Sequence, residues 1–199
     1  MSELPFSAAC ERNKGPIVEV LSQLLKPQAR VLEIGAGTGQ HAVHFTEVLP
    51  GLDWLATDVP ENLAGLNARI AAEATDRLAP AVALDVAHGP WPAGRFDAVY
   101  TANTLHIMPF ELAPALFAGA SQVLDRNGLL ICYGPFQDDG AHSAESNRQF
   151  DLMLRSRDFA MGIRDTRDLD RIARRHGLIR QADIALPANN RILIFRRAQ

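Results

Sequence analysis

Three glycines at alternate positions, Gly35, Gly37 and Gly39, constrain the fold of this chain more than any other feature. They follow the mainly apolar residues 30–34, which predict a buried strand. Glycine suits such a turn because the backbone takes φ values that a Cβ disfavours and because a ligand comes close to the main chain. A helix that starts after the turn directs free N–H groups and a positive dipole end towards that ligand. We therefore expect a cofactor cradle at the mouth of a parallel sheet, with an ordinary strand-turn-helix connection as the alternative.

The spacing of these glycines distinguishes between cofactors. The dinucleotide fingerprint is G-x-G-x-x-G, whereas this chain has G-x-G-x-G and places Gln40 where that fingerprint has its third glycine. With an acidic residue two positions before the first glycine, the stretch resembles the first motif of class I S-adenosylmethionine-dependent methyltransferases. The resemblance implies that the turn passes under the amino-acid end of the cofactor. The implied cofactor residues in this stretch are Glu33, Gly35, Ala36, Gly37, Gly39 and His41.

Composition and charge are those of an ordinary globular protein. The chain has 199 residues, 47% of them hydrophobic and 22% charged, which favours one domain over residues 1–199. A net charge of -3 gives no reason to expect a nucleic-acid or anionic-membrane partner. Cys10 and Cys132 have no zinc-site spacing, so we expect reduced thiols and no metal. Without a long apolar run or a signal-like N-terminus, a cytoplasmic location is expected.

The N-terminal residues 1–27 are expected to cover the sheet. Residues 16–25 have helical apolar spacing, with Pro16 at the helix start and Pro27 beyond its end. Residues 7–14 are polar and irregular in pattern, and a solvated leader is the simple interpretation. Their density of hydrogen-bonding groups favours a second one, in which Asn13 and Lys14 close a substrate pocket.

Two aspartates follow the next two predicted strands. Asp58 lies 23 residues after Gly35, close to the interval at which a carboxylate binds ribose hydroxyls in doubly wound sheets. It could also be a loop aspartate that caps the next helix at Pro60. Residues 81–84 predict a third strand, and in the methyltransferase pattern Asp85 and Val86 after it contact adenine. A plain turn aspartate is the alternative for Asp85.

The ends of the fourth and fifth predicted strands supply candidates for chemistry. Residues 96–102 have the pattern of a buried strand, and Asn103 and His106 follow it. Because ligands of open α/β sheets bind beyond the carboxyl ends of the strands, these side chains should face the site. His106 could accept a proton from a methylated atom, or simply hold the loop by hydrogen bonds. A helix over residues 110–124, a stop at residues 127–128 and a strand over residues 129–133 come next, so Tyr133 is a further candidate.

Several short motifs resemble, in order, those of one small methyltransferase-like family whose domain has no known function. They are ERNKGPI (11–17), EIGAGTGQHA (33–42), Asn103 with His106-Ile107, YGPF (133–136), Ser146-Asn147 through Phe150-Asp151, GIRD (162–165) and PANN (187–190). The resemblance implies an α/β fold of the Rossmann-like class I methyltransferase type. That fold has a seven-stranded, mostly parallel sheet with an antiparallel last strand and helices on both faces. It implies S-adenosylmethionine as cofactor and supplies no acceptor.

The last third is expected to complete the substrate side. Residues 134–165, with a helix near residues 150–155, predict an insertion that could act as a lid. Six arginines between Arg164 and Arg180 alternate with aspartates, which favours a solvated helix with pairs such as Asp170 to Arg174 over a nucleic-acid surface. Strands at residues 182–186 and 191–195 flank a tip in which Asn189 and Asn190 are either substrate contacts or plain turn residues.

These inferences predict methyl transfer from S-adenosylmethionine to a small-molecule acceptor. Asn103, His106 and Tyr133 are the candidates for catalysis; Asn13, Lys14, Tyr133, Asn189 and Asn190 are the candidates for substrate binding. Two alternatives remain at this point. One is a module that binds the cofactor without catalysis and acts through partners. The other, a nicotinamide-dependent oxidoreductase, is disfavoured by Gln40.

Overall fold

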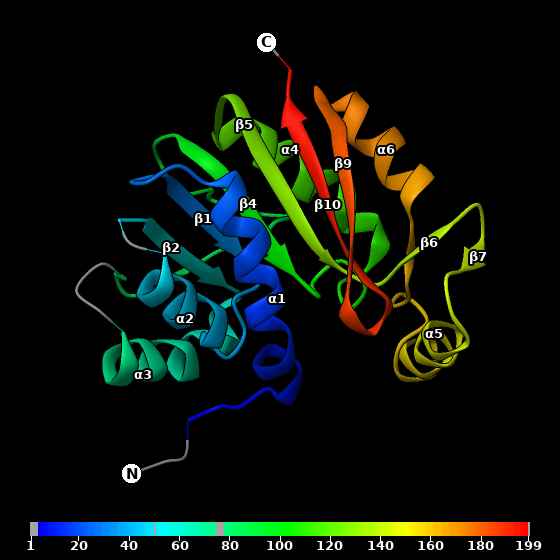
Figure 1. The fold of residues 1–199 in the computed structure, drawn as a ribbon, viewed down its shortest axis with the longest axis horizontal. Helices are drawn as coiled ribbons and strands as arrows, with labels where there is room; N and C mark the ends of the chain where they lie inside the picture. The colour runs from blue at the N-terminus through cyan, green and yellow to red at the C-terminus, as the bar shows by residue number, and fades with distance from the viewer. Residues whose placement is uncertain (1–3, 50, 75–77, 199) are drawn as a thin grey trace.

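A seven-stranded sheet organises the molecule, as this computed structural model shows for residues 4–49, 51–74 and 78–198 (Figure 1). Its strands lie in the order β3-β2-β1-β4-β5-β10-β9. Their bounds are β1 Arg30–Ile34, β2 Asp53–Asp58, β3 Val82–Ala83, β4 Phe96–Ala102, β5 Leu124–Gly134, β9 Leu178–Leu186 and β10 Asn190–Arg197. All neighbours from β3 to β5 pair in parallel, and β10 runs antiparallel between β5 and β9. The predicted mostly parallel sheet with an antiparallel last strand is confirmed.

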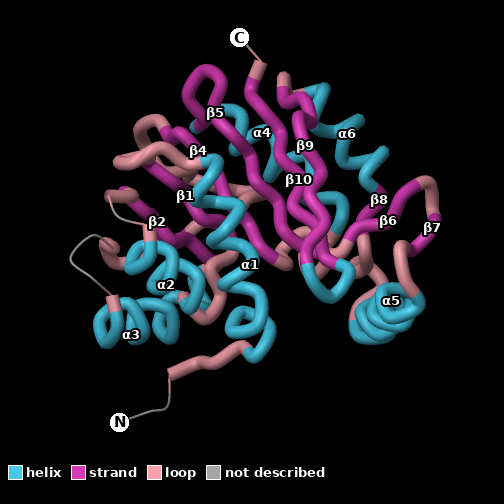
Figure 2. Tube along the Cα trace, viewed as in Figure 1, coloured by secondary structure: helices cyan, strands magenta, loops and turns pink. Residues whose placement is uncertain are grey.

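Helices cover both faces of this sheet, as predicted (Figure 2). One face packs against α1 (Ala8–Leu24), α2 (Gln40–Val48) and α3 (Leu63–Glu73), and the other packs against α4 (Ala113–Val123) and α6 (Thr166–Arg175). Adjacent strand residues divide between the two cores: Val31 lies in the first and Leu32 in the second. This division follows from the two-residue period of a strand, which sends successive side chains to opposite faces. An unbroken apolar strand therefore needs a helical layer on each side.

The N-terminal helix is longer than the sequence predicts. The expected start at Pro16 is wrong, because α1 begins at Ala8 and includes Pro16 in its interior. The hydroxyl of Ser7 accepts a hydrogen bond from the Cys10 N–H and caps the helix. Proline inside a helix removes one hydrogen bond, here to the carbonyl of exposed Arg12, which water can satisfy. Tertiary contacts of the first two turns, described below, offset that loss.

Residues 134–165 form an excursion beside the main sheet, hereafter the insertion. A small three-stranded sheet in the order β7-β6-β8 and the helix α5 are its regular elements. Their bounds are β6 Phe136–Asp138, β7 Ala141–His142, α5 Glu145–Arg157 and β8 Arg164–Asp165. The sequence predicts only the middle of α5, since the two-residue strands carry no readable periodicity. Figure 1 shows α5 at the same edge of the molecule as the lower end of α1.

The C-terminal hairpin places its tip at the carboxyl end of β5. Arg191 pairs with Gly134, so the short helical turn η3 (Pro187–Asn189) lies just beyond Tyr133. Ala188 and Asn189 have left-handed backbone conformations with φ of 60° and 57°. The tip therefore lies at the edge where the parallel strands end, as the parallel arrangement of β5 and β9 predicts.

Three local predictions in this half are wrong. The helix expected to end at Leu124 stops at Val123, because Leu124 already pairs with Phe96 in the sheet. The expected ladder on α6 differs as well: Asp170 pairs with Arg180 of β9 rather than with Arg174. Arg164 is buried instead of forming part of a solvated helix. Each difference comes from a partner distant in sequence.

Candidate functional site

The turn between β1 and α2 has the backbone conformation that the sequence predicts. Gly35, Gly37 and Gly39 take φ values of 71°, 56° and 77°, in the left-handed region that a Cβ disfavours. A Cβ at Gly35 would lie 2.5 Å from Oγ1 of Thr104, and one at Gly39 would lie 2.7 Å from Cδ1 of Leu66. A Cβ at Gly37 would meet no atom of the described residues within 4 Å. Gly35 and Gly39 therefore permit close packing, whereas Gly37 leaves open space beside the turn.

The N-terminus of α2 adds hydrogen-bond donors to this turn. Gly39 is the residue before the helix, and it has no side chain with which to cap the first helical turn. The N–H groups of a first helical turn have no partner within the helix, and the helix dipole makes this end electropositive. Ala36 and His41, at either side, are both buried. The turn is therefore suited to a polar or anionic ligand group that approaches on the Gly37 side.

Asp58, at the end of β2, is tied to the glycine turn. One carboxylate oxygen accepts the Gly37 N–H at 2.6 Å, and the other accepts the Val59 N–H and the Asn62 amide, each at 2.8 Å. A carboxylate offers about four acceptor positions, and three of these are used. Asp58 therefore stabilises the turn and leaves one acceptor position without a donor from the described residues.

Glu33 lies beneath the turn rather than in the open space beside it. Its carboxyl group is buried and accepts a hydrogen bond from the Trp54 indole N–H at 2.9 Å. Burial raises the pKa of Glu33 to about 7, although the hydrogen bond from Trp54 opposes the shift. A large fraction of this group is therefore protonated at neutral pH. Its contacts are those of a core residue that supports β1 and β2 under the turn.

Buried polar groups fasten α1 onto α2. Oδ1 of Asn13 lies 2.7 Å from Nε2 of His41, whose Nδ1 lies 3.3 Å from the Tyr100 hydroxyl. Since the Asn13 oxygen can only accept, Nε2 of His41 carries the proton and Nδ1 accepts from Tyr100. Burial lowers the pKa of His41 to about 4, so the ring is neutral near pH 7. This chain of contacts connects the N-terminal helix to the fourth strand through the helix that follows the turn.

Gln40 has a role that the sequence did not reveal. Its Oε1 accepts the Ser7 N–H at 2.6 Å, and its amide donates to Glu11 at 3.0 Å. The residue that replaces the third glycine of the dinucleotide fingerprint thus holds the first turn of α1 against the glycine turn. Lys14, one of the substrate candidates, forms an ion pair with Glu11 on the same helix.

Asn103 and His106 come together with the end of β5. The Asn103 N–H donates to the Tyr133 carbonyl at 2.8 Å, and Asn103 has a φ of 60°. A Cβ at Gly134 would lie 3.5 Å from Nδ1 of His106 and 3.9 Å from Oδ1 of Asn103. The His106 ring packs edge-on against Phe150 of α5, with ring centroids 5.3 Å apart. The insertion therefore contributes a wall to the His106 environment.

His106 is held in its neutral form. It is 5% exposed, and its ring nitrogens have no hydrogen-bond partner within the described part of the chain. Burial, assisted by the nearby charge of Arg164, lowers the pKa of His106 to about 4. Arg164 donates to the carbonyls of Leu105, Met108 and Ala160 at 2.6–2.8 Å. This buried arginine, which the sequence analysis assigned to a solvated helix, instead clamps the His106 loop to the end of the insertion.

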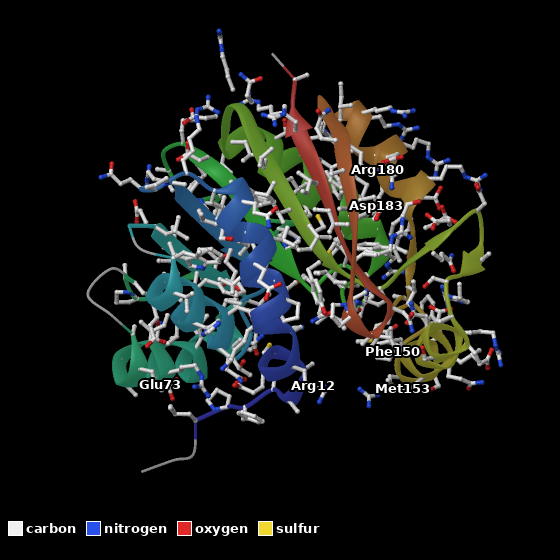
Figure 3. The ribbon with its side chains drawn as sticks, in the orientation of Figure 1. Arg12, Glu73, Phe150, Met153, Arg180 and Asp183 are labelled. Atoms are coloured by element: carbon white, nitrogen blue, oxygen red, sulfur yellow. The ribbon has the colours of Figure 1, made fainter. Side chains whose placement is uncertain are left out.

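Tyr133 lies between these groups and the N-terminal helix. Its side chain is 4% exposed. Burial raises the pKa of the Tyr133 hydroxyl, and a hydrogen bond with Asn13 opposes that shift. Arg12, next to Asn13, is exposed, and its charge also acts on Tyr133. Figure 3 shows Arg12 at the end of α1 that faces the same edge as Phe150 and Met153 of α5.

The remaining candidates lie in turns. Asp85 accepts the Ala87 N–H and pairs with His88, and that hydrogen bond with His88 lowers the pKa of Asp85. Val86 beside it is partly buried. At the hairpin tip, the Asn189 amide donates to Ser146 and its carbonyl accepts from Asn147, so the tip is joined to the start of α5. Asn190 donates to the Pro187 carbonyl.

The structure thus brings most of the candidates to one edge of the sheet. The contacts given above connect the members of this group, which are the glycine turn, Asp58, Asn103, His106, Tyr133 and Asn13. Asp85 and Val86 lie at the end of β3, two strands away from β1. The sequence did not identify four further residues of this region, Gln40, Asn147, Phe150 and Arg164, as site residues. They lie in motifs that resemble the family, but only tertiary contacts reveal what each side chain touches.

No group of three or more histidine, cysteine, aspartate or glutamate side chains suited to a metal ion occurs within residues 4–49, 51–74 and 78–198. Over the same ranges, none of the helices combines the length and apolar character needed to span a bilayer.

Strand order, the glycine turn and the polar groups beyond β4 and β5 define a Rossmann-like α/β protein with the fold of class I S-adenosylmethionine-dependent methyltransferases. Within that class, the chain belongs to the family described as "Protein of unknown function (DUF938)", which matches residues 4–197. The resemblance to a small methyltransferase-like family is consistent with this membership.

Three solved structures whose names describe methyltransferases share this fold. An O-methyltransferase family protein from Burkholderia thailandensis superposes with a TM-score of 0.79 at 19% identity, over 96% of this chain and 58% of its own. Human N-acetylserotonin methyltransferase in complex with SAM superposes with a TM-score of 0.79 at 14% identity, over 96% of this chain and 53% of its own. An O-methyltransferase family 2 protein from Planctomyces limnophilus in complex with apigenin superposes with a TM-score of 0.77 at 17% identity, over 96% of this chain and 60% of its own. This chain therefore spans somewhat more than half the length of these chains, and at such identities the likeness establishes the fold.

Proposed function

We propose that this protein is an S-adenosylmethionine-dependent methyltransferase that acts on a small-molecule acceptor. The observation that carries the proposal is the glycine turn, with Gly37 facing open space beside an uncapped helix N-terminus. A bound polar ligand could approach the main chain there, as the fold class requires. Methyltransferases of the same fold, among them one solved with SAM, support the choice of cofactor.

The residues present fit that cofactor. Gly35, Ala36, Gly37 and Gly39 would lie along its amino-acid end, where α2 supplies backbone donors. Asp58 has one free acceptor position for a ribose hydroxyl and is already anchored by three hydrogen bonds. Asp85, Val86 and Asn103 are proposed for the adenosine side, and His41 and Glu33 support the turn from within the core. Bound S-adenosylmethionine would supply a methyl group on an already activated sulfonium centre.

The acceptor site is proposed between Asn103, His106, Tyr133 and Asn13. His106 is neutral at pH 7. Because its pKa is about 4, the neutral ring is a weak proton acceptor. The residue could still orient an acceptor atom through one ring nitrogen. We therefore infer that the methylated atom is unprotonated at neutral pH before transfer, such as a carboxylate oxygen or another anionic oxygen. The protein would then align the two groups and exclude water rather than remove a proton.

The other substrate candidates contribute less directly. Asn189 and Asn190 are engaged in the hairpin tip and with α5, and Lys14 is paired with Glu11. They are proposed to shape the rim of the site. The insertion, whose Phe150 ring packs against His106, is proposed as the lid that excludes water.

One experiment separates the candidate functions. Calorimetric titration with S-adenosylhomocysteine and with NAD tests the cofactor, and radiolabelled S-adenosylmethionine incubated with the small-molecule fraction of a cell extract tests transfer. Saturable binding of S-adenosylhomocysteine together with label in a metabolite is the expected result. Binding without any label would support the module that holds the cofactor without catalysis. Preferential binding of NAD would refute the assignment.

His106 provides a sharper test of the chemistry once transfer is observed. Because its pKa lies near 4, kcat should be independent of pH between about pH 6 and 8. His106→Gln should lower kcat while keeping that flat profile, and His176→Gln, at the residue that follows α6, serves as a control that should change neither. A wild-type kcat that rises through a pKa near 7 and loses this dependence in His106→Gln would show instead that His106 acts as a general base.

A further inference from the structure

A second candidate binding site lies on the other side of the insertion from the glycine turn. It is a hollow of about 660 Å³ between β6, α6 and β9. None of its lining residues belongs to the glycine turn or to the proposed acceptor site. The volume falls in the range of about 300–1,000 Å³ that is typical of small-molecule pockets. The hollow is therefore large enough for a ligand of several functional groups.

Cationic groups exceed anionic groups in this hollow. Five arginines and three aspartates line it. Arg180 is paired with Asp170 and Asp183, and the lining arginines 167 and 171 each have an aspartate partner. Arg174 and Arg175 are exposed, and neither forms an ion pair with any described residue. The excess of positive charge is therefore concentrated in these two side chains.

The place of Arg174 and Arg175 at the C-terminal turn of α6 has a simple partial explanation. Cations near a helix C-terminus are stabilised by the helix dipole. That effect accounts for basic residues in this turn of the helix. It does not account for a hollow beside them, which concentrates their field and gives a ligand walls to contact.

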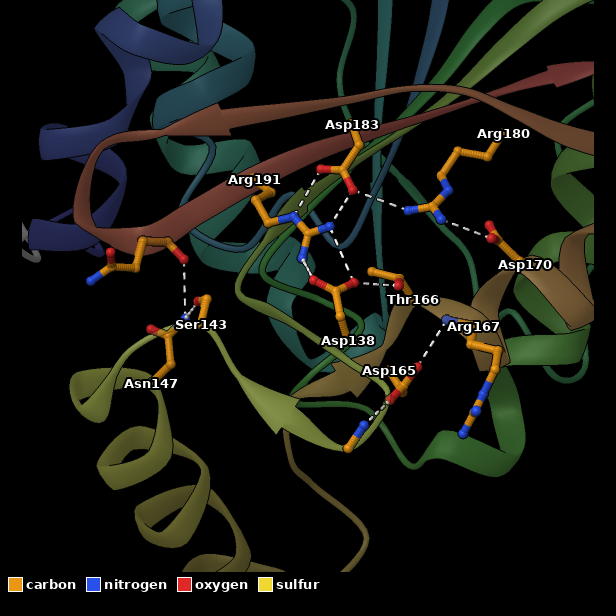
Figure 4. A network of polar contacts seen from close by, with 12 residues as sticks. Asp138, Ser143, Asn147, Asp165, Thr166, Arg167, Asp170, Arg180, Asp183 and Arg191 are labelled. Carbon is orange, nitrogen blue, oxygen red and sulfur yellow. Dashed lines mark hydrogen bonds and ion pairs between the residues drawn. The ribbon is translucent and has the colours of Figure 1, made fainter.

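Ion pairs and hydrogen bonds join the elements that line the hollow (Figure 4). Arg191 bridges Asp183 of β9 and Asp138 of β6, and Asp138 accepts a hydrogen bond from the Thr166 hydroxyl at 2.6 Å. Arg180 extends the network to Asp170 of α6. Polar groups of four elements, β6, β9, β10 and α6, are thus already paired with one another, so a ligand would not have to order them.

One acceptor in this network lacks a donor. Asp170 gives one oxygen to Arg180, whereas its Oδ1 is buried and has no hydrogen-bond partner in the described structure. Buried polar atoms are rarely left unpaired, so such an atom at a lined hollow indicates a donor that a ligand could supply. The hollow therefore combines two free guanidinium groups with one free carboxylate oxygen.

We propose that this hollow binds a small phosphomonoester that also carries hydroxyl groups, such as a sugar phosphate. Arg174 and Arg175 would bind the phosphate, since guanidinium groups match its geometry with paired hydrogen bonds. Asp170 Oδ1 would accept a hydrogen bond from a ligand hydroxyl. A nucleic acid fits less well, because the chain carries a net charge of -3.

Calorimetric titration of the full chain, in the absence of S-adenosylhomocysteine, tests the proposal with ribose 5-phosphate and inorganic phosphate as probes. Ribose 5-phosphate should bind saturably and more tightly than inorganic phosphate. The variant Arg174→Gln/Arg175→Gln should bind both at least about tenfold more weakly. The control Arg126→Gln/Arg157→Gln changes the charge equally at exposed positions outside the hollow, and it should stay within about twofold of wild type.

Four results would overturn the proposal. They are the absence of saturable binding by wild type, equal affinity for the two probes, an equal loss in the control variant, and binding to a single-stranded oligonucleotide that strengthens with its length. Asp170→Ala should abolish the preference for ribose 5-phosphate while it leaves phosphate binding in place. Should that variant fail to fold, the comparison of the two probes on wild type still decides the hydroxyl part.

Discussion

Gly37 gives the most direct test of the glycine turn, because its space and strain can be separated. Its φ of 56° is disfavoured for other residues, and a left-handed conformation costs a non-glycine residue about 1–2 kcal/mol. For a chain of this length, 1 kcal/mol shifts Tm by about 2–4 °C, so Gly37→Leu should lower Tm by about 2–8 °C. No described neighbour would clash with the new side chain, so the variant should fold.

The same substitution should abolish cofactor binding. A leucine at position 37 would fill the open space through which we propose that the amino-acid end of the cofactor passes. We expect the affinity for S-adenosylhomocysteine to fall by about a hundredfold or more, which corresponds to about 2.8 kcal/mol. Isothermal titration calorimetry on the folded variant measures this loss directly.

Gly140→Leu is a closely matched control. Gly140 also has a positive φ, of 78°, and open space at its Cβ, and its N–H donates to a carboxylate, that of Asp165, at 2.6 Å, as that of Gly37 does to Asp58. Both variants should lose similar stability, yet only Gly37→Leu should lose binding. Unchanged affinity in Gly37→Leu, or equal losses in the two variants, would refute the reasoning.

Three further predictions concern stability and mobility. The pKa of Glu33 is raised from 4.5 to about 7, so the carboxyl group is protonated in the folded protein at pH values below about 7. The stability that this group contributes should therefore be lost as pH rises from about 4.5 through 7. In urea unfolding, Glu33→Gln should lose less free energy of unfolding over this pH range than the wild type, and an identical pH dependence would contradict the assignment. Asn13→Ala leaves Nε2 of buried His41 without an acceptor and should lower the free energy of unfolding, measured with urea, by about 1–3 kcal/mol. A decrease of less than about 0.3 kcal/mol would mean that the contact is not formed. Asn147→Ala removes the hydrogen bond from the start of α5 to the Asn189 carbonyl of the hairpin tip, so amide hydrogen exchange should accelerate over residues 145–150 and stay unchanged in β4 and β5. Equal exchange rates over residues 145–150 in the wild type and in Asn147→Ala would show that the tip does not hold the insertion.

The candidate site could be predicted from the sequence only in part. The positions of Asn103, His106 and Tyr133 at one edge follow from the rule that parallel strands end together, and the structure places them there. The state of each side chain could not be predicted. The neutrality of His106 depends on burial against Phe150 and on the charge of Arg164, which is 58 residues away. The proposed roles of these residues in binding and catalysis stay predictions.

Periodicity and backbone chemistry in the sequence determined the class of fold. Apolar runs such as β4 and the alternate glycines after β1 specify strand, turn and helix through interactions within a few residues, so they can be read locally. Only the tertiary structure decided that α1 continues through Pro16, that Asp170 pairs with Arg180, and that Gln40 bonds Ser7. These outcomes depend on polar partners that the packing of helices and sheet brings together. No local pattern encodes such pairs, because a buried polar group takes whichever partner the packing brings within hydrogen-bond distance.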